Sequence, residues 1–168
     1  MPKIIENLEN RLMEEARRQI EESGYGAMTI RSVAAACGVG VGTVYNYFPS
    51  KDELLAAYML RDWHRCIAAV EAISEISLFP EPVARCIYEQ LRDYGSRHGM
   101  IFRDESAATA FAGSFSRYHG LLRSQLSQPL RKFCSGDFLA DFLAESLLTW
   151  TMVGKSFEEI YGVIQKLL

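Results

Sequence analysis

The sequence predicts an all-α protein in which a small helical module precedes a larger helical domain. Apolar residues recur at helical spacing along the chain, without the alternation that is typical of strands. Gly and Pro stand between these periodic segments, where helices end. Residues 24–51 contain no Asp or Glu, although the whole chain carries 21 acidic and 18 basic residues. We place a three-helix domain in residues 1–50 and a larger helical domain in residues 51–168.

The first expected helix precedes Gly24 and has an apolar residue at every fourth position: Ile4, Leu8, Leu12, Ala16 and Ile20. Thr29 then stands before an apolar i, i+3, i+4, i+7 row, as an N-cap does, and Gly38 ends that row. A second short helix runs from Val41 to Phe48, where Pro49 stops it. Two short helices around a glycine turn are typical of a helix-turn-helix, whose second helix enters the major groove of DNA.

The remaining helices follow from caps and breaks. Ser50 and Glu53 have the spacing of a capping box, which opens a helix of about 25 residues that continues through Ile73. Pro80 and Pro82 mark its end. Further helices are expected at 83–98 with Gly99 as the terminal glycine, at 105–124, at 138–153, and from a second capping box at Ser156 to Leu168.

The helix-turn-helix segment resembles the DNA-binding half of TetR/AcrR-type transcriptional regulators. The similarity covers about a third of the chain and is carried by Gly24-Tyr25-Gly26, Thr29-Ile30-Arg31, Val33-Ala34, Cys37-Gly38-Val39, Gly42-Thr43-Val44-Tyr45 and Tyr47-Phe48-Pro49-Ser50-Lys51-Asp52-Glu53-Leu54-Leu55. The remainder matches this family only in length and helical character. Two positions depart from the pattern, because Gly40 stands where Ser is usual and Val41 where Lys or another polar residue is common.

Nine residues are candidate DNA contacts. Those expected at phosphates are Thr29, Tyr45, Tyr47 and Lys51, and Arg31 is a further candidate in the same acid-free segment. Those expected at base edges are Val41, Gly42, Thr43 and Asn46. Two alternatives stay open: the tyrosines can pack partly against the first helix, and Asn46 can point to solvent or phosphate.

The last two helices are apolar over more than one face. Either they fill the centre of their own domain, or they pair with a second copy as a four-helix bundle, which the family resemblance implies. We predict a homodimer whose interface contains Phe142, Trp150, Ile164 and Leu167.

The resemblance implies that residues 1–50 form a helix-turn-helix DNA-binding domain and residues 51–168 an effector-binding and dimerisation domain. It also implies a pocket for a small-molecule effector of unknown identity. The middle of the chain is rich in aromatic residues, although aromatics at helical spacing more often belong to a core. The candidates are Tyr88, Phe102, Phe111, Phe115 and Tyr118.

Neither catalysis nor a cofactor is expected. The three histidines are isolated, and no nucleophile elbow or phosphate-binding loop is present. The four cysteines have no metal-ligand spacing, and no run of about 20 apolar residues predicts a membrane span. We therefore expect a cytoplasmic, ligand-responsive repressor that binds a palindromic operator as a dimer. The alternative is a helical ligand-binding or scaffold protein whose helix-turn-helix no longer binds DNA. This alternative stays open because Gly40 and Val41 depart from the family pattern.

Overall fold

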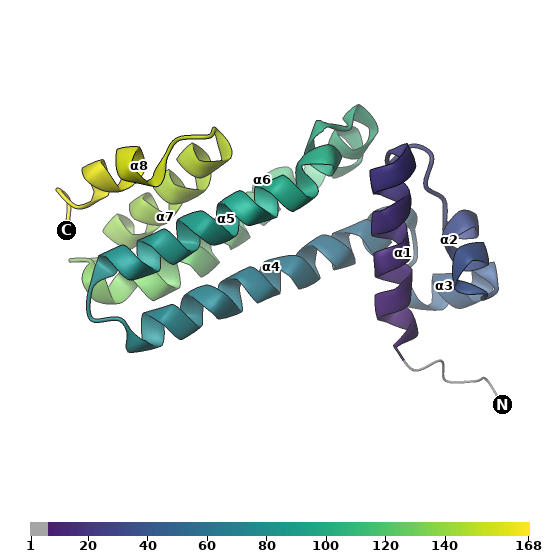
Figure 1. Cartoon of the computed structure of the whole chain (residues 1–168), viewed down its shortest axis with the longest axis horizontal. Helices are drawn as coiled ribbons and strands as arrows, with labels where there is room; N and C mark the ends of the chain where they lie inside the picture. Colours follow the sequence, from purple (N-terminus) through teal and green to yellow (C-terminus); the bar gives the residue numbers. More distant parts are fainter. Residues whose placement is uncertain (1–6) are drawn as a thin grey trace. The chain divides into compact units, whose positions relative to one another are not determined.

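The computed structural model describes residues 7–168, except for the side chains of residues 108 and 110–118. These residues form helices and no strand, which confirms the predicted all-α class (Figure 1). None of the described helices is long and apolar enough to cross a membrane. In chain order the helices are α1 (Leu8–Ser23), α2 (Ile30–Cys37), α3 (Val41–Tyr47), α4 (Lys51–Ile76), α5 (Pro80–Arg103), α6 (Glu105–Ser127), the 3-10 helix η1 (Gln128–Phe133), α7 (Asp137–Met152) and α8 (Phe157–Ile164).

The chain divides into two compact units. The first comprises Met1–Arg61 and His98–Ala112, and the second comprises Asp62–Arg97 and Gly113–Leu168. The start of α4 contributes Leu54, Leu55 and Tyr58 to the core of the first unit. The first unit therefore extends to Arg61, whereas the predicted boundary is at residue 50. It also includes the end of α5 and the start of α6.

The core of the first unit is built on the apolar repeat of α1. Leu8, Leu12, Ala16 and Ile20 are all buried, and they pack with apolar residues of α2 and α4. Full burial of a Leu or Ile side chain stabilises a fold by about 1.5–3 kcal/mol. This core fixes the positions of the two short helices, which are too short to be stable alone.

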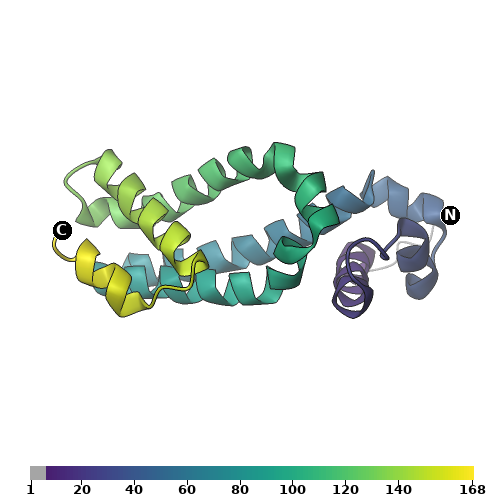
Figure 2. The ribbon, with the colours of Figure 1, turned by 90° about the horizontal axis from the view of Figure 1, so that it is seen from above.

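The second unit has its own core around Trp63 of α4, with apolar residues of α5 and α7 packed against it. Trp63 donates a hydrogen bond from Nε1 to Oε1 of Gln125 at 2.6 Å. Helix α8 lies beside α7 (Figure 2). Its first residue, Phe157, is held on two sides: the Tyr161 ring stacks on it at 5.1 Å between centroids, and the Arg85 guanidinium lies 4.0 Å from its centroid.

Helix α5 differs from the prediction. It begins at Pro80 and ends at Arg103, whereas the sequence predicted a helix over residues 83–98 that ended at Gly99. Proline lacks the N–H that the first turn of a helix does not need, so Pro80 can open the helix. Gly99 lies within the helix, where a glycine costs only about 0.5–1 kcal/mol relative to alanine.

Candidate nucleic-acid interface

Helix α2 is held by caps at both ends. Thr29 is its N-cap: its Oγ1 accepts the Ser32 N–H at 3.0 Å, and the Ser32 Oγ accepts the Thr29 N–H at 3.1 Å. Gly38 ends the helix with φ of 69°, the left-handed conformation that glycine adopts without strain. The predicted cap and terminal glycine are therefore both confirmed. The Thr29 hydroxyl remains on an exposed side chain, where the sequence placed a phosphate contact.

Helix α3 has a buried side and an exposed side. Val44 is fully buried, and the following C-cap residue Phe48 is 4% exposed, so these two side chains anchor the helix to the unit core. On the other side, Tyr45 is 50% and Tyr47 is 44% exposed, and Asn46 between them is also exposed. The helix thus presents two phenols and an amide to its surroundings and carries no charged side chain. This combination suits contact with phosphates and base edges.

The N-terminal end of α3 is less exposed than its sequence suggested. Gly40 is the N-cap, in an extended conformation with φ of −71°. Val41 packs partly against the unit core, and Thr43 is half-buried, whereas Gly42 is exposed. Of the four residues expected at base edges, Gly42 and Asn46 are therefore the most accessible.

Two cations flank these helices. Arg31 is exposed on the first turn of α2. Lys51 is the first residue of α4, and its Nζ donates to the Tyr25 carbonyl oxygen at 3.2 Å while lying 4.1 Å from the centroid of the Tyr25 ring. An ammonium group has three N–H donors, so this bond leaves two for a phosphate. Lys51 is held in place before any ligand is bound.

Residues 12–58, which contain this entire arrangement, match the family model for bacterial regulatory proteins of the tetR family. Over these residues the chain matches the TetR family. The family match covers α2 and α3 completely, together with most of α1 and the start of α4. The sequence resemblance is thereby confirmed on the segment that carried it.

Curated relatives of this chain are transcriptional regulators. UidR of Escherichia coli K12 is 26% identical over 83 residues, which cover 47% of this chain and 42% of UidR. The transcriptional repressor KstR of Mycobacterium tuberculosis is 36% identical over 102 residues, which cover 61% of this chain and 46% of KstR. The chain thus spans less than half the length of the curated relatives it matches.

The fold of the chain also has a solved counterpart. The transcriptional regulator SCO7518 from Streptomyces coelicolor A3(2) superimposes with a TM-score of 0.73 over 96% of this chain and 98% of that one. The two sequences are 14% identical, so the comparison supports the fold.

Only two of the five predicted effector residues have side chains in the described part of the chain, and they belong to different units. Tyr88 belongs to the second unit, where it packs on the core with its ring 5.6 Å from that of Phe157. Phe102 belongs to the first unit and is 44% exposed. The side chains of Phe111, Phe115 and Tyr118 lie outside the described residues. The effector site therefore stays a prediction.

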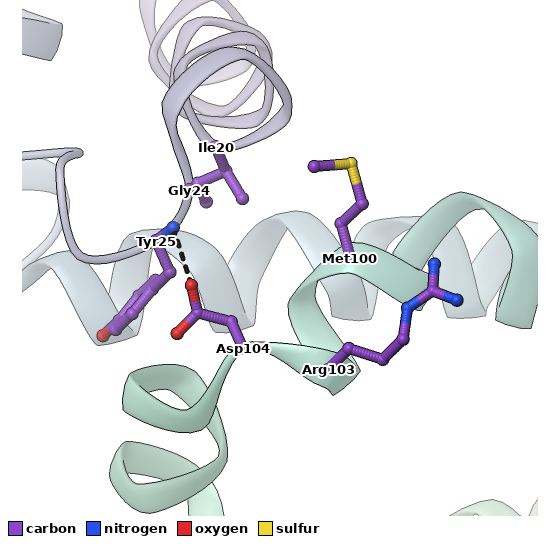
Figure 3. A pocket seen from close by; sticks show the side chains of 6 residues that line it. All are labelled: Ile20, Gly24, Tyr25, Met100, Arg103 and Asp104. Carbon is purple, nitrogen blue, oxygen red and sulfur yellow. Dashed lines mark hydrogen bonds between the residues drawn. The ribbon is translucent and has the colours of Figure 1, made fainter.

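A pocket of about 260 Å³ occurs within the first unit, beside the segment that joins α1 to α2 (Figure 3). It is lined by Ile20, Gly24, Tyr25, Met100, Arg103 and Asp104. None of the predicted effector residues lines it. Two of its lining residues are joined by a hydrogen bond, from the Tyr25 N–H to the Asp104 carboxylate at 3.1 Å.

The predicted dimer residues divide into two groups. Phe142 and Trp150 of α7 are each 48% exposed, and Leu167 beyond α8 is 46% exposed. Ile164 is different: its side chain is 3% exposed and belongs to the core of the second unit. Its assignment to an interface is corrected here, because a side chain already covered by its own protomer has almost no surface left for a partner.

Sequence reasoning missed Tyr25 and Asp104. In the sequence, Tyr25 is only part of the family pattern, and Asp104 belongs to no motif. Asp104 stands directly before α6, where Asp is a favoured N-cap, so its capping role could have been predicted. Its contact with Tyr25, 79 positions away in the chain, has no signal in the sequence.

Proposed function

We propose that this chain is a DNA-binding transcriptional regulator, in which α3 enters the major groove of an operator. The observation that carries the proposal is the two-sided character of α3: Val44 and Phe48 anchor it, while Tyr45, Asn46 and Tyr47 are exposed. This helix lies within an acid-free segment that matches the family model. The absence of carboxylates in residues 24–51 removes the repulsion that a polyanion would otherwise meet there.

The proposed contacts follow from exposure. Tyr45 and Tyr47 offer hydroxyl groups to phosphates, while Lys51 and Arg31 supply cations and Thr29 a further hydroxyl. Asn46, which is exposed, would pair with adenine through N6 and N7, a contact that discriminates by about 1–3 kcal/mol. Gly42 allows DNA to approach the helix backbone closely, because it has no side chain on an exposed position.

We further propose that the chain acts as a homodimer on a palindromic operator. The exposed apolar side chains of α7 and of the chain after it support this proposal, since Phe142, Trp150 and Leu167 together leave a large apolar surface uncovered. A twofold dimer would present two α3 helices to two half-sites. Operator binding would then depend on dimer formation, because each half-site alone binds weakly.

The regulator is proposed to be a repressor that acts in the cytoplasm, has no enzymatic activity and responds to a small molecule. The relationship to the repressor KstR supports the direction of regulation. The effector would bind in the second unit, which contains most of α5, α6 and α7. Its chemical identity does not follow from the residues described.

Selection from a random double-stranded DNA library tests the proposal. The purified chain should enrich an inverted repeat, as expected for two half-sites bound by a symmetric dimer. A chain with both Tyr45→Ala and Asn46→Ala changes is the control, because it alters only exposed residues of α3 and should enrich no common sequence. If the unaltered chain enriches no sequence either, the alternative is favoured: a helical ligand-binding or scaffold protein that no longer binds DNA.

A further inference from the structure

Tyr25 connects three parts of the first unit. It follows α1 directly after Gly24, and it is 2% exposed. Its N–H donates to the Asp104 carboxylate at 3.1 Å, and its carbonyl oxygen accepts the Lys51 ammonium at 3.2 Å. Its hydroxyl donates to the carboxylate of Asp52, the second residue of α4. One buried residue thus joins the segment between α5 and α6 to the beginning of α4.

Asp104 divides its two oxygens between two tasks. Oδ1 accepts the N–H groups of Ser106 and Ala107 at 2.9 and 3.1 Å, and so caps α6. Oδ2 accepts the Tyr25 N–H, as the dashed line in Figure 3 shows. A carboxylate has two acceptor oxygens, whereas an amide side chain has one. Asp at this position can therefore cap the helix and hold Tyr25 at the same time.

We propose that Asp104 is a positioning residue for the contact between Lys51 and a DNA phosphate. By fixing the backbone of Tyr25, Asp104 fixes both the carbonyl oxygen and the ring that hold the Lys51 ammonium. Lysine has a long, flexible side chain, and its ordering on binding lowers affinity. A Lys51 side chain that is ordered beforehand avoids this loss. The inference rests on the proposed DNA-binding function.

Asp104→Asn separates the two tasks of the carboxylate. Asn is as good an N-cap as Asp, so the remaining oxygen can still cap α6. The amide nitrogen is a donor and cannot accept the Tyr25 N–H. We expect this variant to keep the helical circular dichroism of the unaltered chain and to bind the selected operator roughly three- to tenfold more weakly. Asp104→Ser, which caps but is too short to reach Tyr25, is a second variant with the same expectation.

A double-mutant cycle with Lys51→Met decides whether Asp104 acts through Lys51. In the Lys51→Met background, Asp104→Asn should change operator affinity by less than about twofold, because the group that it positions is gone. An equal loss of affinity in both backgrounds would overturn the inference, as would no loss in the presence of Lys51. Either result leaves DNA binding by the unaltered chain in place, so it does not count against the proposed function.

The side-chain NMR signal of Lys51 tests the same link without DNA. In the unaltered chain, the Tyr25 ring should shift the signals of the nearby Lys51 methylene protons away from those of mobile lysines. That shift should shrink in Asp104→Asn. Signals at the positions of mobile lysines in the unaltered chain would overturn the inference, even if neither Asp104 variant folds. Failure of the unaltered chain to bind any DNA would instead count against the proposed function.

Discussion

Val44 and Tyr45 are neighbours in α3, but Val44 is fully buried and Tyr45 is 50% exposed. This contrast divides the helix into an anchoring side and a side that is available to a ligand. Tyr45 is a large aromatic residue, and the protomer leaves half of it accessible to solvent. Exposed aromatic groups with polar tips are common at binding surfaces, where one part packs and the other forms hydrogen bonds. The TetR-family match covers this exposed side.

Replacement of Asn46 by Ala should change base preference rather than folding. Asn46 is exposed, so its removal leaves no buried group without a partner. We expect the preference for one base pair in each half-site to fall by about 1–3 kcal/mol. Repeated selection from a random DNA library with the variant measures this change. Unaltered preferences at every position would show that Asn46 does not contact a base.

Removal of the α2 cap should weaken the helix-turn-helix locally. Thr29→Ala eliminates the acceptor for the Ser32 N–H and should cost about 0.5–2 kcal/mol. Amide hydrogen exchange at the buried α2 residues Val33 and Ala34 measures this loss within the first unit. Thr29→Ser is the matched control, because it keeps the capping oxygen and should exchange as the unaltered chain does. Equal protection in Thr29→Ala and Thr29→Ser would show that the cap does not stabilise α2.

Trp150 and Ile164 should respond differently to the same change. Trp150→Glu alters a half-exposed residue, so the chain should keep its circular dichroism and sediment as a monomer. Ile164→Glu places a charge in the core, which is strongly disfavoured, so the second unit should lose its fold. Leu78→Glu, at an 86% exposed apolar position between α4 and α5, is a control that should remain dimeric. If the Trp150→Glu variant is still a dimer, the interface does not include the exposed side of α7.

The cap of α8 should weaken in acid. Hydrogen bonds from Lys155 and Ser156 lower the pKa of Glu159 from 4.5 to about 2. A carboxyl whose pKa is lower in the folded state stabilises the fold above its unfolded value, and this contribution disappears as pH falls towards the folded value. The difference in urea midpoint between the unaltered chain and Glu159→Gln should therefore be largest above pH 4.5 and should shrink towards pH 2. A difference that is constant across this range would contradict the assignment.

Local signals in the sequence predicted local structure well. The Thr29 cap, the Gly38 terminus and the Ser156 capping box are all present, because each depends on residues a few positions apart. The prediction that Pro80 lies in a break between helices is wrong, because α5 begins at this residue. Proline is compatible with the first turn of a helix as well as with a gap between helices, so its presence alone does not distinguish the two.

Long-range packing could not be predicted in the same way. Because α7 and α8 are apolar on more than one side, the pattern could not show that Ile164 is covered within the protomer while Trp150 is half exposed. The contact between Tyr25 and Asp104 joins segments that have no pattern in common. Lys51 was predicted as a phosphate contact, but its bond to the Tyr25 carbonyl oxygen required the structure.

The measurement that tests sequence-specific DNA binding most directly is a salt titration of affinity for two duplexes. One carries the sequence selected by the chain, and the other carries the same bases in scrambled order. Between about 50 and 200 mM salt, a DNA-binding regulator should lose affinity for both duplexes as phosphate contacts are screened. At each salt concentration it should prefer the selected duplex by about 1,000-fold or more. Equal affinity for the two duplexes, or binding that does not depend on salt, would contradict the proposed function.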